Sequence, residues 1–133
     1  MVDEAPAPKV LVPIITQIHK ASMCKSPLGT YGFHITTHLA NIPNDNTWQI
    51  SWEAWFQQAM RRMFEVEERV HGKDPTLESL KKALHEKAIS RLLRPLETGG
   101  RSIQPCLIHS DIWPGNAMHD SDTYEVIIFD SCA

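Results

Sequence analysis

The sequence predicts a mainly α-helical chain with one small β element near its C-terminal end. Three segments place apolar residues at three- and four-residue steps, as on one face of an amphipathic helix. After Gly100 the pattern changes to two short, nearly continuous apolar runs, which are typical of strands. With 133 residues, 42% of them hydrophobic and 22% charged, the chain has the composition of a globular domain or of part of one.

Charge and cysteine usage exclude several classes of protein. The formal net charge is −3, so we expect no nucleic-acid partner. No apolar run approaches the roughly 20 residues that span a bilayer, and the acidic, Pro/Ala-rich start is unlike a secretory signal. Cys24, Cys106 and Cys132 are widely spaced, which favours reduced thiols. We therefore expect a cytoplasmic protein with no membrane partner, whose oligomeric state is unknown.

The first helix is expected over residues 9–23, where "KVLVPIITQIHKASM" has helical spacing. Pro13 suits the first turn of a helix, because a missing N–H costs little there. Residues 1–8 are expected to form a disordered leader. After this helix, prolines, glycines and an Asn/Asp cluster predict an irregular segment with room for one short strand over residues 33–37.

The longest helix is expected over residues 47–71, with Asn46 or Thr47 as its cap and Gly72 at its end. Three tryptophans begin its apolar face. Their helical spacing favours packing in the core over a ligand-stacking surface. They are Trp48, Trp52 and Trp55.

A third helix is expected over residues 75–96. Asp74 can cap it, and Pro75 suits its first position. Its apolar stripe consists of Leu77, Leu80, Leu84, Ala88 and Leu92.

Two strands are expected beyond the third helix, in the runs "PCLIH" and "YEVIIFD". They bracket a loop over residues 109–116 that contains Pro114 and Gly115. The second run belongs to a closing segment, residues 124–133, that carries Asp130.

The polar residues of this closing part suit phosphoryl transfer. That reaction needs a carboxylate to accept the proton of the attacking hydroxyl, and further oxygen donors to hold the Mg²⁺ that offsets the phosphate charge. Protein kinases place a base, then an Asn five residues later, then an Asp after the next strand. The same order predicts Asp111 as the base and Asn116 and Asp130 as metal ligands. His109 is expected to brace the loop.

The same residues also have simpler interpretations. A single Asp in a Pro/Gly-containing loop is more often a turn residue, but the whole spaced pattern is rarely accidental. Histidine and cysteine spacings at His34 and His38, and at Cys106 and His109, do not complete a set of four ligands, so no zinc site is expected.

The stretch "LIHSDIWPGN", followed by "IIFDSCA", resembles the fructosamine kinase family, also called ketosamine or protein-ribulosamine 3-kinases. The stretch "SPLGTYGFHITTHLANIPNDNTW" is similar to the family too, so the resemblance covers nearly the whole chain after the leader. The family usually has Gly where this chain has Ser110. We expect Ser110 to be tolerated if its φ is negative and costly if it is not. Trp113 favours this family over the related aminoglycoside phosphotransferases.

The resemblance implies a protein-kinase-like α+β fold, with residues 9–133 forming part of its C-terminal lobe. It implies ATP-dependent phosphorylation of the sugar 3-hydroxyl of ketosamines on protein amines, with ATP as co-substrate and Mg²⁺ as cofactor. The phosphorylated adduct is unstable, so the reaction reverses glycation. The expected partner is a glycated protein or a small ketosamine. Trp113 and His34 are weaker candidates for the substrate side of the site.

No Gly-rich loop or strand-borne Lys of an ATP-binding lobe is visible in the sequence, and the family continues beyond the closing segment. We therefore expect a fragment that turns over little or no substrate by itself. Two alternatives stay open. The chain could be a non-catalytic module that binds a sugar or a partner, or a kinase for another small hydroxyl substrate, such as an aminoglycoside.

Overall fold

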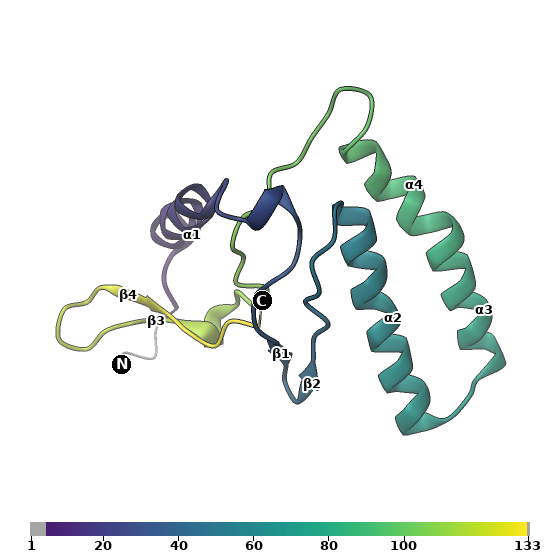
Figure 1. Ribbon diagram of the computed structural model, residues 1–133. Helices are drawn as coiled ribbons and strands as arrows, with labels where there is room; N and C mark the ends of the chain where they lie inside the picture. Colours follow the sequence, from purple (N-terminus) through teal and green to yellow (C-terminus); the bar gives the residue numbers. More distant parts are fainter. Residues whose placement is uncertain (1–4, 133) are drawn as a thin grey trace. The chain divides into compact units, whose positions relative to one another are not determined.

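The computed structural model describes residues 5–132 and divides into two compact units (Figure 1). One unit combines residues 1–25 with residues 106–133, and the other consists of residues 26–105. The loop predicted to carry the chemistry therefore belongs to the same unit as the first helix, although about 80 residues separate them in sequence.

The first unit opens with helix α1 (Pro8–Ser22). The helix begins at Pro8, so Pro13 lies in its interior, and the expectation of Pro13 in the first turn was wrong. Residues 1–4 of the expected leader lie outside the described residues, while Pro8 already belongs to the helix. At the other end, the Ser22 hydroxyl accepts a hydrogen bond from Leu107 N (2.8 Å) and thereby ties α1 to the segment before the loop.

The β element of this unit is a hairpin of β3 (Ala117–His119) and β4 (Val126–Ile128). The strands are antiparallel, and Ala117 is paired with Ile128. Asp120 shapes the turn, since its Oδ1 accepts from Asp122 N (2.9 Å) and Thr123 N (2.8 Å). These backbone bonds lower the pKa of Asp120.

The strand expected in "PCLIH" is absent, because residues 105–109 pair with no described strand. The partner of β4 is instead the short run "AMH" after the loop. Both strands of the hairpin therefore come after the loop, and Asn116 is the residue immediately before β3.

The second unit begins with irregular chain, held together by backbone pairing rather than by long strands. Tyr31 and Gln49 form an antiparallel bridge, with N–O distances of 2.8 and 2.7 Å. A short hairpin, whose strands β1 (His38–Leu39) and β2 (Ile42–Pro43) have two residues each, lies between Tyr31 and Gln49 in sequence. The strand expected over residues 33–37 was therefore placed too early.

Helix α2 (Trp52–His71) begins five residues later than the sequence predicted. Its cap is Ser51, whose Oγ accepts from Ala54 N (3.1 Å). Asn46 is unavailable as a cap because it is buried, and its Nδ2 donates to Ile35 O (3.0 Å) within the preceding loop. The helix ends at Gly72, which has φ of 82°.

The third expected helix contains a π-helical turn. Helix α3 (Pro75–Ala83) is capped by Asp74 and continues through the π-helical turn Leu84–Ile89 into α4 (Ser90–Leu93) and a 3₁₀ turn, Arg94–Leu96. A π-helical turn adds one residue to the helical period and rotates all later side chains. Ile89 is therefore buried (2% exposed), while Leu92, expected on the apolar stripe, is 68% exposed.

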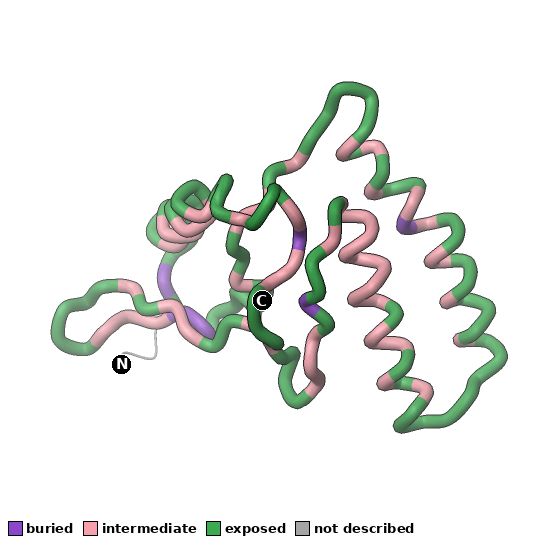
Figure 2. The backbone as a smooth tube through the Cα atoms, viewed as in Figure 1, coloured by how far each residue is buried: buried purple, intermediate pink, exposed green. Residues whose placement is uncertain are grey.

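The tryptophans of α2 pack partly against one another. The rings of Trp52 and Trp55 are stacked with centroids 5.0 Å apart, and Tyr31 lies 5.9 Å from Trp52. Trp48 precedes the helix and is 36% exposed. Burial, together with the nearby Glu97 carboxylate, raises the pKa of Tyr31 to about 12. Figure 2 shows that few residues are fully buried and that most of α2 is half-buried.

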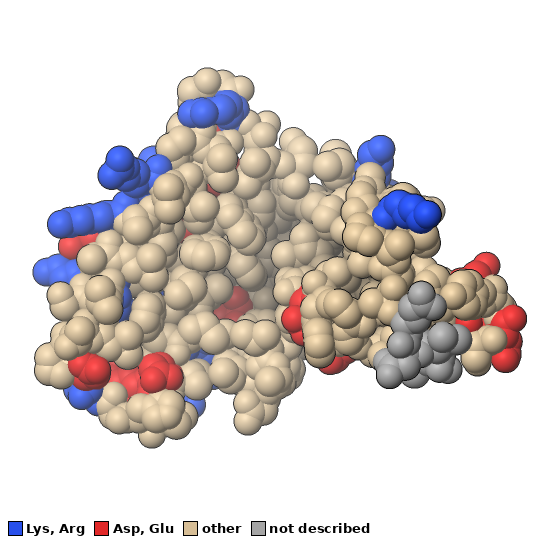
Figure 3. Space-filling view, turned by 180° about the vertical axis from the view of Figure 1, so that it is seen from behind, with Lys and Arg blue, Asp and Glu red and all other residues tan. Residues whose placement is uncertain are grey.

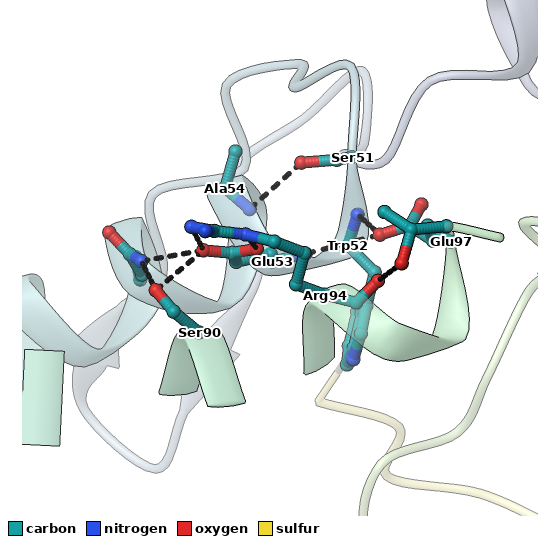
Figure 4. A network of polar contacts seen from close by, with 9 residues as sticks. Ser51, Trp52, Glu53, Ala54, Ser90, Arg94 and Glu97 are labelled. Atoms are coloured by element: carbon teal, nitrogen blue, oxygen red, sulfur yellow. Dashed lines mark hydrogen bonds and ion pairs between the residues drawn. The ribbon is translucent and has the colours of Figure 1, made fainter. Parts of the chain in front are cut away.

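Polar contacts join the start of α2 to the start of α4 and to the turn after α4 (Figure 4). Arg94 binds Glu53 with both Nη2 (2.8 Å) and Nε (3.0 Å), and the Ser90 hydroxyl donates to the same carboxylate at 2.7 Å. Glu97 Oε2 accepts from Trp52 N at 2.9 Å. Two acidic side chains thus lie at the N-terminus of α2, where the helix dipole favours negative charge.

No helix in residues 5–132 is both long and apolar enough to cross a membrane.

Candidate active site

The loop of the first unit brings Asp111 and Asn116 into direct contact. Asn116 Nδ2 donates to the Asp111 carboxylate Oδ2 and to the Asp111 carbonyl, both at 2.9 Å. A 3₁₀ turn, Pro114–Asn116, closes the loop, with Asn116 N donating to Trp113 O (2.9 Å). Asn116 is buried (5% exposed), whereas Asp111 is exposed. The loop therefore presents a carboxylate to solvent on a buried amide support.

His109 holds the loop against the end of β4. Its Nε2 lies 2.8 Å from the Phe129 carbonyl, and its Nδ1 accepts a long hydrogen bond from Asp111 N (3.4 Å). With Nδ1 as acceptor, the ring proton lies on Nε2 and is donated to Phe129. The His109 carbonyl also accepts from Cys132 N (3.1 Å). His109 thus binds the closing segment through its ring and its backbone.

Asp130 follows Phe129 directly, at the end of the hairpin. Phe129 N donates to the Asn116 carbonyl (3.2 Å), so the residues before Asp130 are joined to the end of the loop. Asp130 is exposed and has φ of 58°. No hydrogen bond within the described residues joins its carboxylate to Asp111 or Asn116.

Cys132 also belongs to this part of the chain, two residues after Asp130. Burial raises the pKa of the Cys132 thiol, and the negative charge of Asp111, followed by that of Asp130, raises this pKa further. Sequence reasoning did not assign Cys132 to the site, and nothing in its spacing indicates it.

The donor set fits a hard divalent cation. Both N–H groups of the Asn116 amide face Asp111, so its Oδ1 points away from that residue, and no described residue donates to it. An amide oxygen and carboxylate oxygens are donors that Mg²⁺ prefers. Among residues 5–132, no cluster of three or more His, Cys, Asp or Glu side chains could hold a metal.

The electrostatics of the closing part also favour a cation. Figure 3 shows acidic side chains gathered over the β3–β4 hairpin region. Residues 106–133 contain no Lys or Arg. Their acids are Asp111, Asp120, Asp122, Glu125 and Asp130.

Ser110 has φ of 68°, in the left-handed region that favours glycine. The sequence left two outcomes for the serine at this position, and the structure has the costly one. The strain lies next to Asp111, where sparsely populated backbone conformations are frequent in functional loops.

The two residues expected on the substrate side belong to different units. Trp113 lies in the loop and is 56% exposed. His34 is exposed in the second unit, with its ring centroid 4.4 Å from that of Phe33. A substrate role for either stays a prediction.

Comparisons with known proteins agree on one family. The sequence matches the family model described as fructosamine kinase over residues 7–133. The protein-ribulosamine 3-kinase, chloroplastic, of Oryza sativa subsp. indica is 29% identical over 121 residues, covering 89% of this chain and 32% of that protein. The ketosamine-3-kinase of Mus musculus is 37% identical over 101 residues, covering 75% of this chain and 30% of that protein.

A structural comparison gives the fold. The chain is similar to the crystal structure of a Thermobifida fusca protein provisionally described as a fructosamine-3-kinase, with a TM-score of 0.57 and 19% identity. The match covers 99% of this chain and 42% of that one. The expected fold class, a mainly α part of a protein-kinase-like α+β fold with a small β element, is confirmed. The chain spans about a third of the length of the curated relatives it matches.

Proposed function

Because this chain belongs to the fructosamine kinase family, we propose that it carries the catalytic loop of an ATP-dependent ketosamine 3-kinase. The proposed reaction transfers a phosphoryl group to the sugar 3-hydroxyl of a ribulosamine or fructosamine on a glycated protein, or of a small ketosamine. The observation that carries the proposal is the contact between Asn116 and Asp111, which holds an exposed carboxylate beside an amide oxygen.

Asp111 is proposed to accept the proton of the attacking hydroxyl. The Asn116 amide donates to Oδ2 of Asp111, while Oδ1 of Asp111 accepts no hydrogen bond from the described residues. That oxygen is therefore free to face an acceptor hydroxyl. The backbone contacts of His109 hold the loop in this orientation, so His109 acts as a structural residue.

Asn116 and Asp130 are proposed to hold Mg²⁺, which when bound offsets the negative charge of the ATP phosphates. The support is the orientation of the Asn116 amide and the hydrogen bond from Phe129 N to the Asn116 carbonyl, which joins the residue before Asp130 to the end of the loop. Residues 106–133 contain no Lys or Arg that could offset the phosphate charge instead.

Residues 9–133 are proposed to form part of the substrate-side, C-terminal lobe, with the catalytic loop at residues 109–116 and a metal-binding segment at residues 124–133. The names of the relatives support a ketosamine as the acceptor class. A cytoplasmic location stays a prediction from composition.

The test is ATP-dependent phosphorylation by a full-length family member with Asn at the position aligned with Asp111. We expect turnover to fall by about 10²- to 10⁴-fold, because the general base is lost. The free energy of unfolding should change by less than about 1 kcal/mol, because Asp111 is exposed. The matched control is the same substitution at the position aligned with Asp122, an exposed acid in the hairpin turn. Unchanged turnover in the Asp111 variant would show that Asp111 is not the base.

A second experiment compares acceptors. Ribulosamine, fructosamine and an aminoglycoside compete for phosphorylation by the same full-length enzyme. Preference for a ketosamine supports the proposed substrate class, whereas preference for the aminoglycoside assigns a different small hydroxyl substrate. Binding of a ketosamine without any phosphorylation assigns a non-catalytic module.

A further inference from the structure

The segment that leads into the catalytic loop, residues 106–108, pairs with no described strand. Within the described part of the chain, Leu107 is the one residue of this segment whose backbone N–H donates a hydrogen bond. Its acceptor is the hydroxyl of Ser22, 2.8 Å away, at the last position of α1 in the same unit. Because backbone polar groups outside a ladder need other partners, this side chain replaces a neighbouring strand.

The Ser22 hydroxyl is fixed in direction by α1 itself. Ser22 Oγ donates to the Ile18 carbonyl (2.8 Å), and the His19 carbonyl is a second acceptor at 3.1 Å. A serine hydroxyl has one proton to donate and two lone pairs that accept. Since the proton is directed back into the helix, a lone pair remains for Leu107 N. The half-buried Ser22 is therefore an oriented acceptor and not a freely rotating one.

Two attachments hold the start of the loop. His109 is bound to the closing segment, since its Nε2 donates to Phe129 O (2.8 Å) and its carbonyl accepts from Cys132 N (3.1 Å). Leu107, two residues earlier, is bound to α1. Asp111 N donates to the His109 ring, so Asp111 depends on where that ring lies. A displacement at Leu107 therefore reaches Asp111 through His109.

We propose that Ser22 is a positioning residue of the active site: its hydroxyl holds Leu107 and thereby keeps the His109 ring and Asp111 in the observed orientation. The hydrogen bonds of Ser22 go to α1 and to Leu107, so Ser22 acts on the site only through the approach to the loop. The last turn of α1 is thus a support of the catalytic loop. The effect on metal binding rests on the proposed function, whereas the effect on the His109 ring does not.

The first readout is the His109 ring in the ¹⁵N-labelled chain. Nuclear magnetic resonance of the imidazole nitrogens shows which nitrogen carries the proton, and His109→Gln identifies the His109 signals among those of seven histidines. With the ring neutral, we expect the wild-type proton on Nε2, protected from exchange by Phe129 O. Ser22→Ala should speed the exchange of the Leu107 N–H and leave the His109 ring in a mixture of both tautomers.

The second readout is the Kd for Mn²⁺, a paramagnetic substitute for Mg²⁺ that binds to the same kinds of oxygen donor. It rests on the proposed metal ligands, and Asn116→Ala shows whether the ion is bound at that site. Losing a direct partner of a metal ligand costs about 10- to 100-fold in affinity. Ser22→Ala should raise the Kd by about three- to tenfold, less than that range, because Ser22 acts through Leu107.

Two variants separate this role from damage to the helix. Ser22→Thr retains the hydroxyl and should keep the Leu107 N–H protected and both readouts at their wild-type values. Thr16→Ala is the matched control. The Thr16 hydroxyl donates to Val12 O at 2.8 Å, as Ser22 does to Ile18 O, but among the described residues it has no bond outside α1. Thr16→Ala should leave both readouts unchanged.

Each result decides between the interpretations. An unchanged His109 ring in Ser22→Ala overturns the inference. An equal effect of Thr16→Ala also overturns it, as does a Ser22→Thr chain that protects the Leu107 N–H without restoring the His109 ring. A wild-type chain that binds no Mn²⁺ at Asn116, but whose His109 ring responds to Ser22→Ala, removes the proposed metal ligands and leaves the positioning role of Ser22 in place.

Discussion

The side-chain amide of Asn116 donates to both the carboxylate and the carbonyl of Asp111, at 2.9 Å each. The buried Asn116 side chain therefore holds the proposed base at two points, the Asp111 carboxylate and the Asp111 backbone carbonyl. The spacing of five residues between the two is the length that a turn closed by Pro114–Asn116 allows. The contact explains why the amide is part of the pattern even before a metal is considered.

Asn116→Ala is expected to lower the free energy of unfolding by about 1–3 kcal/mol, because two hydrogen bonds are lost at a buried position. Urea unfolding measures the loss. Asn41→Ala is the control, since Asn41 is exposed, and it should change the same quantity by less than about 0.5 kcal/mol. Equal losses in the two variants would contradict the structural role of the Asn116 amide.

Ser110→Gly is expected to stabilise the chain. The serine has φ of 68°, which costs about 1–2 kcal/mol for a residue with a Cβ, while glycine loses about 0.5–1 kcal/mol of unfolded-state entropy. The net gain should be of the order of 0.5 kcal/mol, measured by urea unfolding. Ser121→Gly in the hairpin turn, where φ is not positive, should instead be destabilising. A loss of stability on Ser110→Gly would refute the strain.

The Glu53–Arg94 pair is expected to make stability depend on acid pH. The hydrogen bond from Arg94, followed by that from Ser90, holds the pKa of Glu53 below its ordinary value of 4.5. Below that value the unfolded chain takes up a proton more readily than the folded chain, so the free energy of unfolding falls as the pH falls. Arg94→Ala should reduce this fall, measured by urea unfolding from neutral to acid pH. Arg91→Ala should keep this dependence, because Arg94, and not Arg91, forms the ion pair with Glu53.

His85 is expected to produce a second pH dependence, nearer neutrality. It lies in the π-helical turn with its ring 6.0 Å from Phe64, and its Nε2 is buried without a hydrogen-bond partner. Burial lowers the pKa of His85 below 6.5, and the charges of Arg61 and Lys81 lower it further. The unfolded chain therefore binds a proton at a higher pH than the folded chain does. The contribution of neutral His85 to the free energy of unfolding is fully present above pH 6.5 and falls as the pH drops below that value.

His85→Leu should remove that fall while preserving stability at neutral pH, because an unpaired buried polar atom is replaced by an apolar group. Unfolding by urea at a series of pH values between neutral and mildly acid conditions measures it. His38→Leu is the control, since His38 is exposed in β1. An unchanged pH profile for His85→Leu would show that another group is responsible.

Local signals predicted the elements whose causes are local. Asp74 caps α3 and Gly72 ends α2, because a carboxylate beside free N–H groups and a residue with positive φ act within one turn. The start of α2 could not be found in this way. Asn46 has the chemistry of a cap, but a partner 11 residues earlier, Ile35, occupies its amide. Ser51 caps α2 instead.

The third helix shows the same difference between local and tertiary causes. Its apolar stripe could be read from the sequence, but which residues of the stripe face the core could not. Leu92 follows the helical period in sequence, yet the π-helical turn rotates it into solvent and places Ile89 in the core. A sequence pattern assumes an uninterrupted α-helical period, so it did not predict the position of either residue.

The order and spacing of His109, Asp111, Asn116 and Asp130 were readable from the sequence alone, because the chemistry of phosphoryl transfer restricts the residue types and a loop restricts their separation. Only the folded chain decided how they are supported. The Phe129 carbonyl and the Cys132 amide, which bind His109, and the Phe129 amide, which binds Asn116, carry no motif. These contacts are made by backbone atoms, which any residue type supplies. They form only when the hairpin brings the closing segment back to the loop.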